Sequence, residues 1–420
     1  MLDMKFIREN PDLVKAGIKK KNDSTDIDQL LNLDESRREV IRTVEELKAK
    51  RNQATQDIAQ KKKAGEKADD AIAAMRKVGQ EISELDNKLR DIEAEMEKIA
   101  HWIPNLPHES VPVGGEEDMV IVREWGEIPK PSFKVLPHWE IGEKLGILDL
   151  EAATKISGSG FYMLRGLGAK LQRALIGYML DLHTKDNFEE ITAPYIVTEE
   201  TMFGTGQLPK MEDDMYKTTE DGMYLIPTAE VSITNIYKKD ILDYKDLPKY
   251  LVGYSPCFRR EAGAAGKDTR GMIRVHQFDK VEMVKIVDPE KSYDELESLV
   301  AQAEKVLQGL KIPYRVGTLA SGDLSFAAAK CYDIELWAAG VEKYLEISSV
   351  SNFESFQARR MNCRYRDAEK KVNFPHTLNG SGVALARLIP AILENYQNED
   401  GTVSIPEVLR PYMGGIEKIS

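Results

Sequence analysis

Cysteine is scarce in this chain of 420 residues. Its three cysteines, Cys257, Cys331 and Cys363, lie far apart, and neither a CxxC motif nor a metal-binding Cys/His spacing occurs. We therefore expect no structural zinc site. Widely spaced cysteines in odd number are typical of reduced thiols, which predicts a cytoplasmic protein.

Long apolar runs and a positive net charge are also missing. No stretch approaches the roughly 18 consecutive apolar residues of a membrane helix, so we expect no membrane span. The first residues, MLDMKFIRENPDLVKAG, are charged and lack the apolar centre of a secretory signal. Because the formal net charge is −12, binding of a nucleic acid would require a local basic patch.

The sequence does contain a long helical pattern between residues 27 and 100. Residues of its second half recur in alternating steps of three and four: Ala68, Ala71, Met75, Val78, Ile82, Leu85, Leu89, Ile92, Met96 and Ile99. The first half repeats this spacing from Val40 to Ile58, and a polar stretch with Gly65 separates the halves. These seams predict two helices folded back on each other as an antiparallel coiled coil. At 1.5 Å per residue, the arm would be about 50 Å long.

The first half of this predicted arm is basic. Between residues 37 and 67, ten lysines and arginines accompany five acidic residues, which leaves a net charge of +5. An ordinary solvated helix face is one explanation, and a surface that follows the phosphates of RNA is the other. The cations that we consider for RNA contact are Arg37, Arg38, Lys48, Lys61, Lys62 and Lys63.

The helical pattern stops after Ala100, and Pro104, Pro107 and Pro112 follow. We place a domain boundary near this segment, which divides the chain into residues 1–110 and residues 111–420. In the second part short strands and helices are interleaved.

The second domain is organised around residues 254–286, which we interpret as two strands joined by a glycine-rich basic loop with Lys267 and Arg270. Strand alternation places Arg259 and Glu261 on one face of the first strand. In the second strand it directs one set of side chains away from the core: Arg274, His276, Phe278, Lys280 and Glu282. The opposite set would face the core: Ile273, Val275, Val281 and Met283. The pattern favours a nucleotide triphosphate site over a solvated sheet face.

Other segments add candidate contacts. Thr228-Ala229-Glu230 closes a short strand, where the carboxylate could hold an ammonium group or the pair could cap the next helix. Glu346 beside two serines offers hard oxygen atoms that suit a Mg²⁺–nucleotide. Residues 202–217 are expected to form a mobile loop, and residues 380–382 a glycine-rich turn before a helix.

In chain order these motifs resemble a known family. FEEITAP, FRRE with HQFDKVE, and the glycine-led helix with Arg387 resemble motifs 1, 2 and 3 of class II aminoacyl-tRNA synthetases. The arm together with GTGQLPK, PTAE, EISS, FQARR, TLNGSG and IPEVLRPYMGG resembles the bacterial type of seryl-tRNA synthetase over essentially the whole chain. The resemblance implies an α+β fold with the class II antiparallel sheet flanked by helices, an N-terminal tRNA-binding arm, and a homodimer formed through the segment of Pro194. It implies ATP and Mg²⁺ as cofactors, L-serine as substrate, and tRNA(Ser) as acceptor, with tRNA(Sec) as a second candidate.

The resemblance also assigns residues. Catalysis is assigned to Arg259, Glu346 and Arg387. ATP contacts are assigned to Arg259, Arg260, Glu261, His276, Phe278, Glu346, Ile347, Ser348, Ser349 and Arg387. Serine contacts are assigned to Thr228, Ala229, Glu230, Arg259, Glu282 and Ser381. Mg²⁺ is assigned to Glu346 and Ser349, and because strict alternation would pair Glu346 with Ser348, this assignment requires a β-bulge.

Two other functions are compatible with parts of the pattern. One is a synthetase-like paralogue that activates an amino acid for an acceptor other than tRNA, and the retained arm argues against it. The other is an RNA-binding scaffold with a decayed active site, and the intact charged positions argue against that. Arg260, Ala386, Val350 and Phe353 depart from residues common in the family, and Pro390 lies within the predicted final helix.

Overall fold

The computed structural model describes residues 1–65, 67–263 and 270–420, so Lys267 of the predicted basic loop lies outside the described residues. The chain forms two compact units, one of residues 2–103 and one of Met1 with residues 104–420. Among the described residues, none of the helices combines the length and apolar character needed to cross a bilayer.

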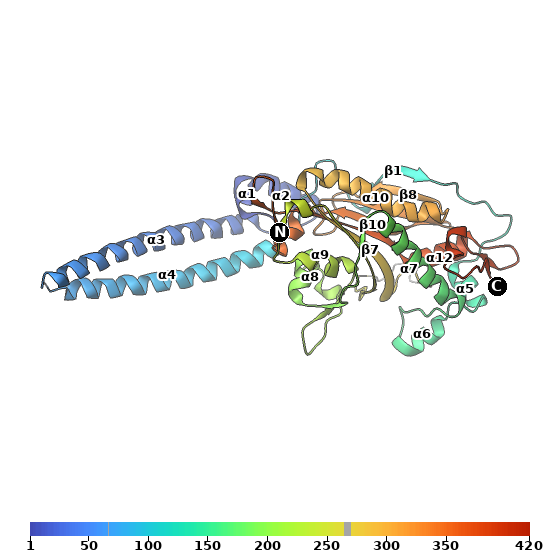
Figure 1. Cartoon of the computed structure of the whole chain (residues 1–420), viewed down its shortest axis with the longest axis horizontal. Coiled ribbons are helices and arrows are strands. Elements are labelled where there is room, and N and C mark those ends of the chain that lie inside the picture. The colour runs from blue at the N-terminus through green and yellow to red at the C-terminus, as the bar shows by residue number, and fades with distance from the viewer. Residues whose placement is uncertain (66, 264–269) are drawn as a thin grey trace. The chain divides into compact units, whose positions relative to one another are not determined.

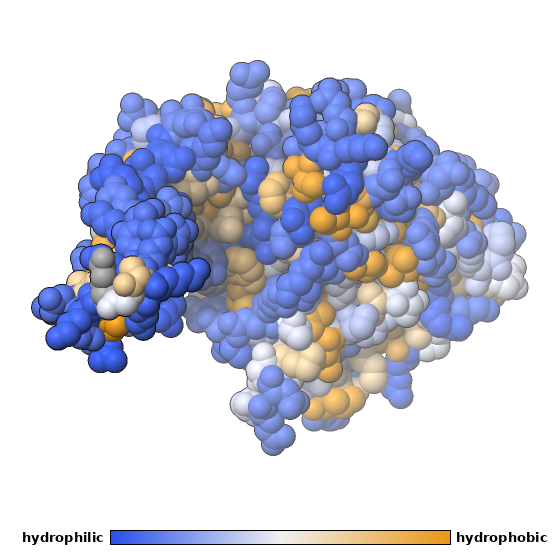
Figure 2. Space-filling model, turned by 60° about the vertical axis from the view of Figure 1, so that its left-hand side comes forward, coloured by the Kyte–Doolittle hydropathy of each residue, from blue (hydrophilic) through white to orange (hydrophobic). Residues whose placement is uncertain are grey.

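The smaller unit consists of four helices: α1 (Met4–Glu9), α2 (Pro11–Lys20), α3 (Ile27–Lys63) and α4 (Asp69–Trp102). The long helices α3 and α4 lie side by side as a hairpin (Figure 1), which confirms the predicted arm. The predicted seam is the buried stripe of both helices, with Val40 and Val44 on α3 facing inward like Ile82 and Ile92 on α4. The hairpin in Figure 2 accordingly presents mostly hydrophilic residues. The seam therefore joins the two helices along their length.

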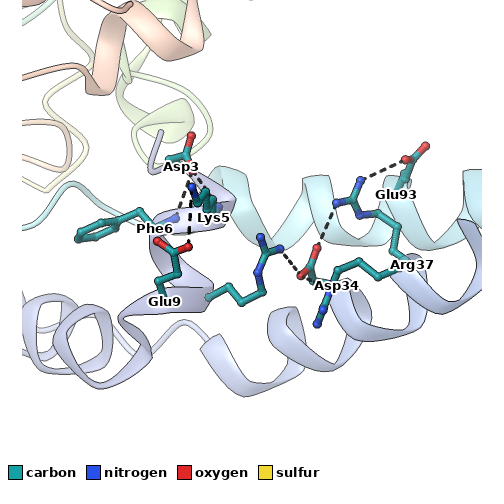
Figure 3. Close-up of polar contacts among 9 residues, drawn as sticks. Asp3, Lys5, Phe6, Glu9, Asp34, Arg37 and Glu93 are labelled. Atoms are coloured by element: carbon teal, nitrogen blue, oxygen red, sulfur yellow. Dashed lines mark hydrogen bonds and ion pairs between the residues drawn. The ribbon is translucent and has the colours of Figure 1, made fainter. Parts of the chain in front are cut away.

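A buried carboxylate anchors the base of this hairpin (Figure 3). Asp34 on α3 is fully buried and accepts hydrogen bonds from Arg8, Arg37 and Arg38 at 2.8, 3.2 and 3.2 Å. Arg37 also lies 3.7 Å from Glu93 on α4. Burial would raise the pKa of Asp34, but the hydrogen bonds from Arg8 and Arg37 lower it below its usual value. One ionised carboxylate thus ties together α1, α3 and, through Arg37, α4.

An eight-stranded sheet forms the centre of the larger unit, in the order β1-β8-β9-β10-β13-β7-β6-β2. Its strands are β1 (Val120–Trp125), β8 (Tyr314–Thr318), β9 (Lys330–Ala338), β10 (Lys343–Asn352), β13 (His376–Ala384), β7 (Gln277–Val287), β6 (Lys249–Phe258) and β2 (Glu189–Glu190). All neighbours are antiparallel except β2, which pairs with β6 in parallel. The expected α+β fold with a mainly antiparallel sheet is confirmed.

Helices cover one face of the sheet. They are α7 (Leu167–Lys185), α10 (Ser292–Gly309) and α12 (Leu385–Asn395). Their residues Leu175, Leu299 and Ile389 belong to one hydrophobic core with Val281 and Met283 of β7. Because side chains alternate along a strand, the next residues of β7 are directed to the other face, where the site lies.

Short elements complete this unit. The helices are α5 (His138–Lys144), α6 (Leu150–Ser157), α8 (Glu199–Thr205), α9 (Ala229–Thr234) and α11 (Phe356–Arg360). The strands are β3 (Ile196–Val197), β4 (Tyr224–Leu225), β5 (Ile241–Asp243), β11 (Arg364–Arg366), β12 (Val372–Asn373), β14 (Val403–Ser404) and β15 (Lys418–Ile419). Hydrophobic residues also reach the surface of this unit in separate areas (Figure 2).

The predicted ends of the two central strands are wrong. Arg259 and Glu261 follow the end of β6, and residues 273–276 precede β7. Ile273 and Val275 line the cavity described below, and Val275 is also buried in a small hydrophobic cluster as expected. The reason is that the backbone leaves the sheet ladder here. The amide of Arg260 donates to the carbonyl oxygen of Asp214, and the amide of His276 to that of Gly160, in segments distant along the chain.

Two loop predictions are also corrected. The segment expected to be a mobile loop begins inside helix α8, which ends at Thr205. The glycine-rich turn expected at residues 380–382 lies within β13, where the register shifts between Ser381 and Val383. The strand expected before Pro194 is only two residues long, although it does lie at the sheet edge.

Candidate active site

The larger unit contains a cavity of about 880 Å³ on the open face of the sheet. It is lined by most of the predicted site residues: Thr228, Glu230, Arg259, Glu261, Phe278, Glu346, Ile347, Ser348, Ser349, Ser381 and Arg387. These residues come from the ends of β6 and α9 and from β7, β10, β13 and α12. The fold therefore brings together side chains up to 159 positions apart, since Thr228 and Arg387 both line the cavity.

Four predicted residues do not line the cavity, and one of them, Glu282, is fully buried against Lys280. Nη1 of Arg260 donates to the carbonyl oxygen of Asp213, 3.1 Å away. Nδ1 of His276 lies 3.1 Å from the carbonyl oxygen of Arg259, so this imidazole contacts the backbone that follows β6 and does not face the cavity. Ala229 is buried at the start of α9.

One part of the cavity combines an aromatic ring with cations. The guanidinium of Arg259 lies 5.2 Å from the centre of the Phe278 ring. Nη1 of Arg387 donates to the carbonyl oxygen of Glu346 at 2.6 Å and lies 3.4 Å from its carboxylate. Glu261 pairs with Arg274, 2.5 Å away. A flat aromatic wall beside guanidinium groups suits a purine with attached phosphates.

The predicted bulge in β10 is present. Its pairing with β9 shifts between Glu346 and Ser348, so Ser349 as well as Glu346 lines the cavity. The hydroxyl of Ser349 donates to the carboxylate of Asp333, which is its register partner on β9. Burial and the charge of Glu346 raise the pKa of Asp333 to about 8. Sequence reasoning missed Asp333, because only the register of β9 against β10 identifies it.

Oxygen donors at this place fit a magnesium ion. Within the described part of the chain, no group of three or more His, Cys, Asp or Glu side chains could hold a metal ion by itself. Glu346 and Ser349 supply hard oxygen atoms that face the cavity. Mg²⁺ commonly takes one or two protein oxygens and completes its coordination with substrate phosphates and water.

Another part of the cavity is lined by Thr228, Glu230, Lys280 and Asn379, and the buried carboxylate of Glu282 lies next to it. Nδ2 of Asn379 donates to Glu230 at 3.1 Å and to Glu282 at 2.8 Å. Nζ of Lys280 donates to Thr228 at 2.8 Å and lies 2.5 Å from Glu282. The carboxylates of Glu230 and Glu282 thus lie close together, with the charges of Lys280 and Arg259 nearby.

The environment of Glu230 shifts its protonation. Burial and the nearby charge of Glu282 raise the pKa of Glu230 to about 7, although the hydrogen bond from Gln357 lowers it. Thr228 accepts a hydrogen bond from the amide of Glu230 at 3.3 Å and caps α9. The capping role considered from the sequence is therefore present together with the position at the cavity.

The cations considered for RNA contact all lie on α3 in the smaller unit. Arg37 and Arg38 bond to Asp34, and Lys48 lies 3.7 Å from Asp86. The last turn of the helix carries three exposed cations: Lys61, Lys62 and Lys63. These three side chains are therefore accessible to a polyanion.

Comparison with known families gives two matches. Residues 1–107 match the model of the seryl-tRNA synthetase N-terminal domain, and residues 211–396 match that of the tRNA synthetase class II core domain (G, H, P, S and T). The chain is 56% identical over 416 residues to the serine--tRNA ligase of Caldicellulosiruptor saccharolyticus, covering 99% of both chains. It is 53% identical over 423 residues to that of Geobacillus kaustophilus, covering 100% of both.

Solved structures give the same result. Seryl-tRNA synthetase from Pyrococcus horikoshii, complexed with ATP, superposes with a TM-score of 0.95 at 40% identity, covering 100% of this chain and 99% of that one. The cytoplasmic serine-tRNA ligase of Naegleria fowleri, in complex with AMP, superposes with a TM-score of 0.89 at 34% identity and the same coverage.

Proposed function

This chain belongs to the seryl-tRNA synthetase family of class II aminoacyl-tRNA synthetases, and from that premise we propose which of its residues bind each substrate. It is a serine--tRNA ligase, which activates serine and charges tRNA(Ser). The observation that carries the proposal is that Arg259, Phe278, Glu346 and Arg387 line the same cavity as Glu230. A cationic, aromatic part beside an acidic part suits ATP and an amino acid held against each other.

ATP occupies the aromatic and cationic part in this proposal. Adenine stacks on Phe278, with Arg387 closing the other side, and Glu261 accepts from the adenine amino group. Arg259 binds the α-phosphate. Support comes from the distance of 5.2 Å between the Arg259 guanidinium and the Phe278 ring. Arg260 and His276 have the supporting role of holding the turn after β6, since both bond to backbone carbonyls there.

Serine occupies the acidic part. Its ammonium group binds Glu230 and Thr228, and its hydroxyl binds Glu282 and Ser381, which lie 3.3 Å apart. Its carboxylate faces Arg259. A pocket that hydrogen-bonds a hydroxyl leaves buried polar groups unpaired when alanine binds, so such a site rejects alanine strongly.

Glu346 and Ser349 would hold Mg²⁺ on the triphosphate. When bound, this ion supplies charge neutralisation for the phosphates. Ile347 and Ser348 also line the cavity at this point, where the hydroxyl of Ser348 donates to the carbonyl oxygen of Ser381 at 2.6 Å.

The reaction then needs no nucleophilic side chain. A carboxylate oxygen of serine attacks the α-phosphorus of ATP, the bond to the bridging oxygen breaks, and pyrophosphate leaves. A hydroxyl of the terminal ribose of tRNA next attacks the seryl carbonyl, and AMP leaves. The enzyme contributes positioning and positive charge through Arg259 and Arg387.

The partners follow the same premise. The arm of α3 and α4 selects tRNA(Ser), and tRNA(Sec) is a second candidate acceptor. We propose a homodimer that forms through the segment around Pro194, beside the short edge strand β2. The reaction would take place in the cytoplasm.

Serine-dependent exchange of pyrophosphate into ATP tests the proposed site. Arg259→Ala should reduce the exchange rate at least about 100-fold, because it removes the charge opposite the reacting phosphate. Arg366→Ala is the matched control, since Arg366 is exposed on β11 away from the cavity. Near-normal exchange by Arg259→Ala would contradict the assignment. A second assay measures the charging of total tRNA with labelled serine and so tests whether tRNA is the acceptor.

A further inference from the structure

Gln357 on α11 is a buried polar residue behind the acidic part of the cavity, with 1% of its surface exposed. Nε2 donates to the carboxylate of Glu230 at 2.7 Å and to the carbonyl oxygen of Thr205 at 3.0 Å. Its Oε1 accepts from the hydroxyl of Thr377 at 2.7 Å. All three partners are themselves buried.

The partners determine how this amide is oriented. Two acceptors, a carboxylate and a backbone carbonyl, surround the nitrogen, and the NH₂ group has one hydrogen for each of them. The third partner is a hydroxyl, which can donate to the amide oxygen. The opposite orientation would place the oxygen against two acceptors, so the network allows a single orientation.

Each partner belongs to a different element of the cavity wall. Glu230 is in the first turn of α9, Thr205 is the last residue of α8, and Thr377 is in β13. Gly206 and Gln207, which follow Thr205, also line the cavity. Gln357 itself does not line the cavity. It forms hydrogen bonds to Thr205 at the end of α8 and to Glu230 in α9, which both line it.

We propose that Gln357 is a positioning residue for the amino group of the amino-acid substrate: it orients the Glu230 carboxylate and holds the end of α8 beside it. The proposal rests on the proposed function, because it assumes that Glu230 binds the ammonium group. Gln357 acts through Glu230 and touches neither substrate nor reacting atoms. Through Glu230, Gln357 thus contributes to the preference of the site for a substrate that carries an α-ammonium group.

The first test is Gln357→Met, which keeps the volume and removes the hydrogen bonds. Losing a buried hydrogen bond to a charged group should raise the KM for serine about 10- to 100-fold, while the KM for ATP changes less than about twofold. Gln397→Met is the matched control, since Gln397 also bridges backbone groups, those of Leu136, outside the cavity. An unchanged KM for serine in Gln357→Met would overturn the proposal.

The pH profile separates positioning from general damage to the fold. Donation from Gln357 favours the ionised form of Glu230, so its removal should move the midpoint of serine binding upward by about one pH unit. The affinity of the variant should therefore recover partly between pH 7 and 8.5. An equal loss of affinity at every pH would overturn the proposal.

A second variant covers the case in which Gln357→Met does not fold. Thr377→Val is isosteric and frees the amide of Gln357 to rotate, so it should raise the KM for serine about threefold to tenfold. Unaltered serine binding in this variant would count against the network. If the unmodified enzyme lacked serine-dependent exchange, the proposed function itself would fail, and the two failures are therefore distinguishable.

Discussion

The protonation of Glu230 depends on its surroundings. The residue is buried near Glu282, Lys280 and Arg259, and the first of these neighbours adds to the effect of burial on its pKa. A carboxyl group with a pKa of about 7 changes its charge within the physiological pH range. An incoming ammonium group favours the ionised form, so binding of serine should be linked to release of a proton.

Serine affinity should accordingly decrease as the pH falls through about 7, because protonation of Glu230 removes the charge that binds the ammonium group. We expect affinity to be lost by about fivefold between pH 7 and pH 6, because the ionised fraction of a group with a pKa of about 7 falls by that factor. Calorimetry in buffers of different ionisation enthalpy measures both the affinity and the released proton. In Glu230→Gln, binding should be weak and independent of pH between 6 and 8. A pH-dependent affinity in that variant would assign the titration to another group.

At the scale of elements, the base of the arm depends on a single carboxylate. Asp34 is fully buried and bonds to three arginines, one from α1 and two from its own helix. The side chains of these arginines are 29 to 52% exposed, so water can hydrogen-bond to their guanidinium groups when the carboxylate is removed. Removal of the carboxylate should therefore cost less than breaking a fully buried ion pair.

Asp34→Ala should lower the free energy of local unfolding at α1 and the start of α3 by about 2 kcal/mol, since three donors lose their acceptor. Hydrogen exchange followed by mass spectrometry should then show about 30-fold faster exchange in these segments. Asp57→Ala is the matched control, because Asp57 is exposed on the same helix and accepts a hydrogen bond from Gln53, one turn earlier. Equal protection in both variants would show that Asp34 does not stabilise the base of the arm.

For the whole molecule, the two units imply a division of work. The cavity and all its lining residues belong to the larger unit, whereas the basic helix α3 belongs to the smaller one. Activation of serine should therefore need the larger unit alone, and recognition of tRNA should need the arm as well. Such a division is typical when binding energy from a remote contact positions a large substrate.

Shortening the arm tests this division. Lys48 on α3 and Asp86 on α4 lie 3.7 Å apart, so a short glycine-containing turn can replace residues 49–85 and leave the base with Asp34 in place. Serine-dependent pyrophosphate exchange should change less than about twofold, and charging of tRNA(Ser) should fall at least about 100-fold. Activity assays of both steps on the same preparation provide the comparison. A parallel loss of both activities would refute the division.

Local periodicity made much of this protein predictable. The three- and four-residue steps from Ala68 to Ile99 identified the buried seam of α4, since a helix exposes the same face at that spacing. Alternation along residues 278–282 identified Phe278, Lys280 and Glu282 as one face of β7. The bulge that allows Ser349 to line the cavity beside Glu346 was predicted only by combining the two-residue period with the family assignment of Ser349, since the period alone pairs Glu346 with Ser348.

Long-range pairing decided the rest. The residue period of a helix or strand predicts which way a side chain points. It does not predict which distant residue the side chain contacts, because this contact depends on strand register and on hydrogen bonds between distant backbone segments. Asp333 reaches Ser349 only through the register of β9 with β10, and Asn379 lies between two carboxylates only through that of β13 with β7. Local patterns in the sequence were enough to predict the arm, and the resemblance of its motifs to a family predicted the antiparallel sheet. Tertiary structure alone decided where the strands end and how Gln357 connects three elements, because its hydrogen bonds to Thr205 and Glu230 join segments more than a hundred residues apart.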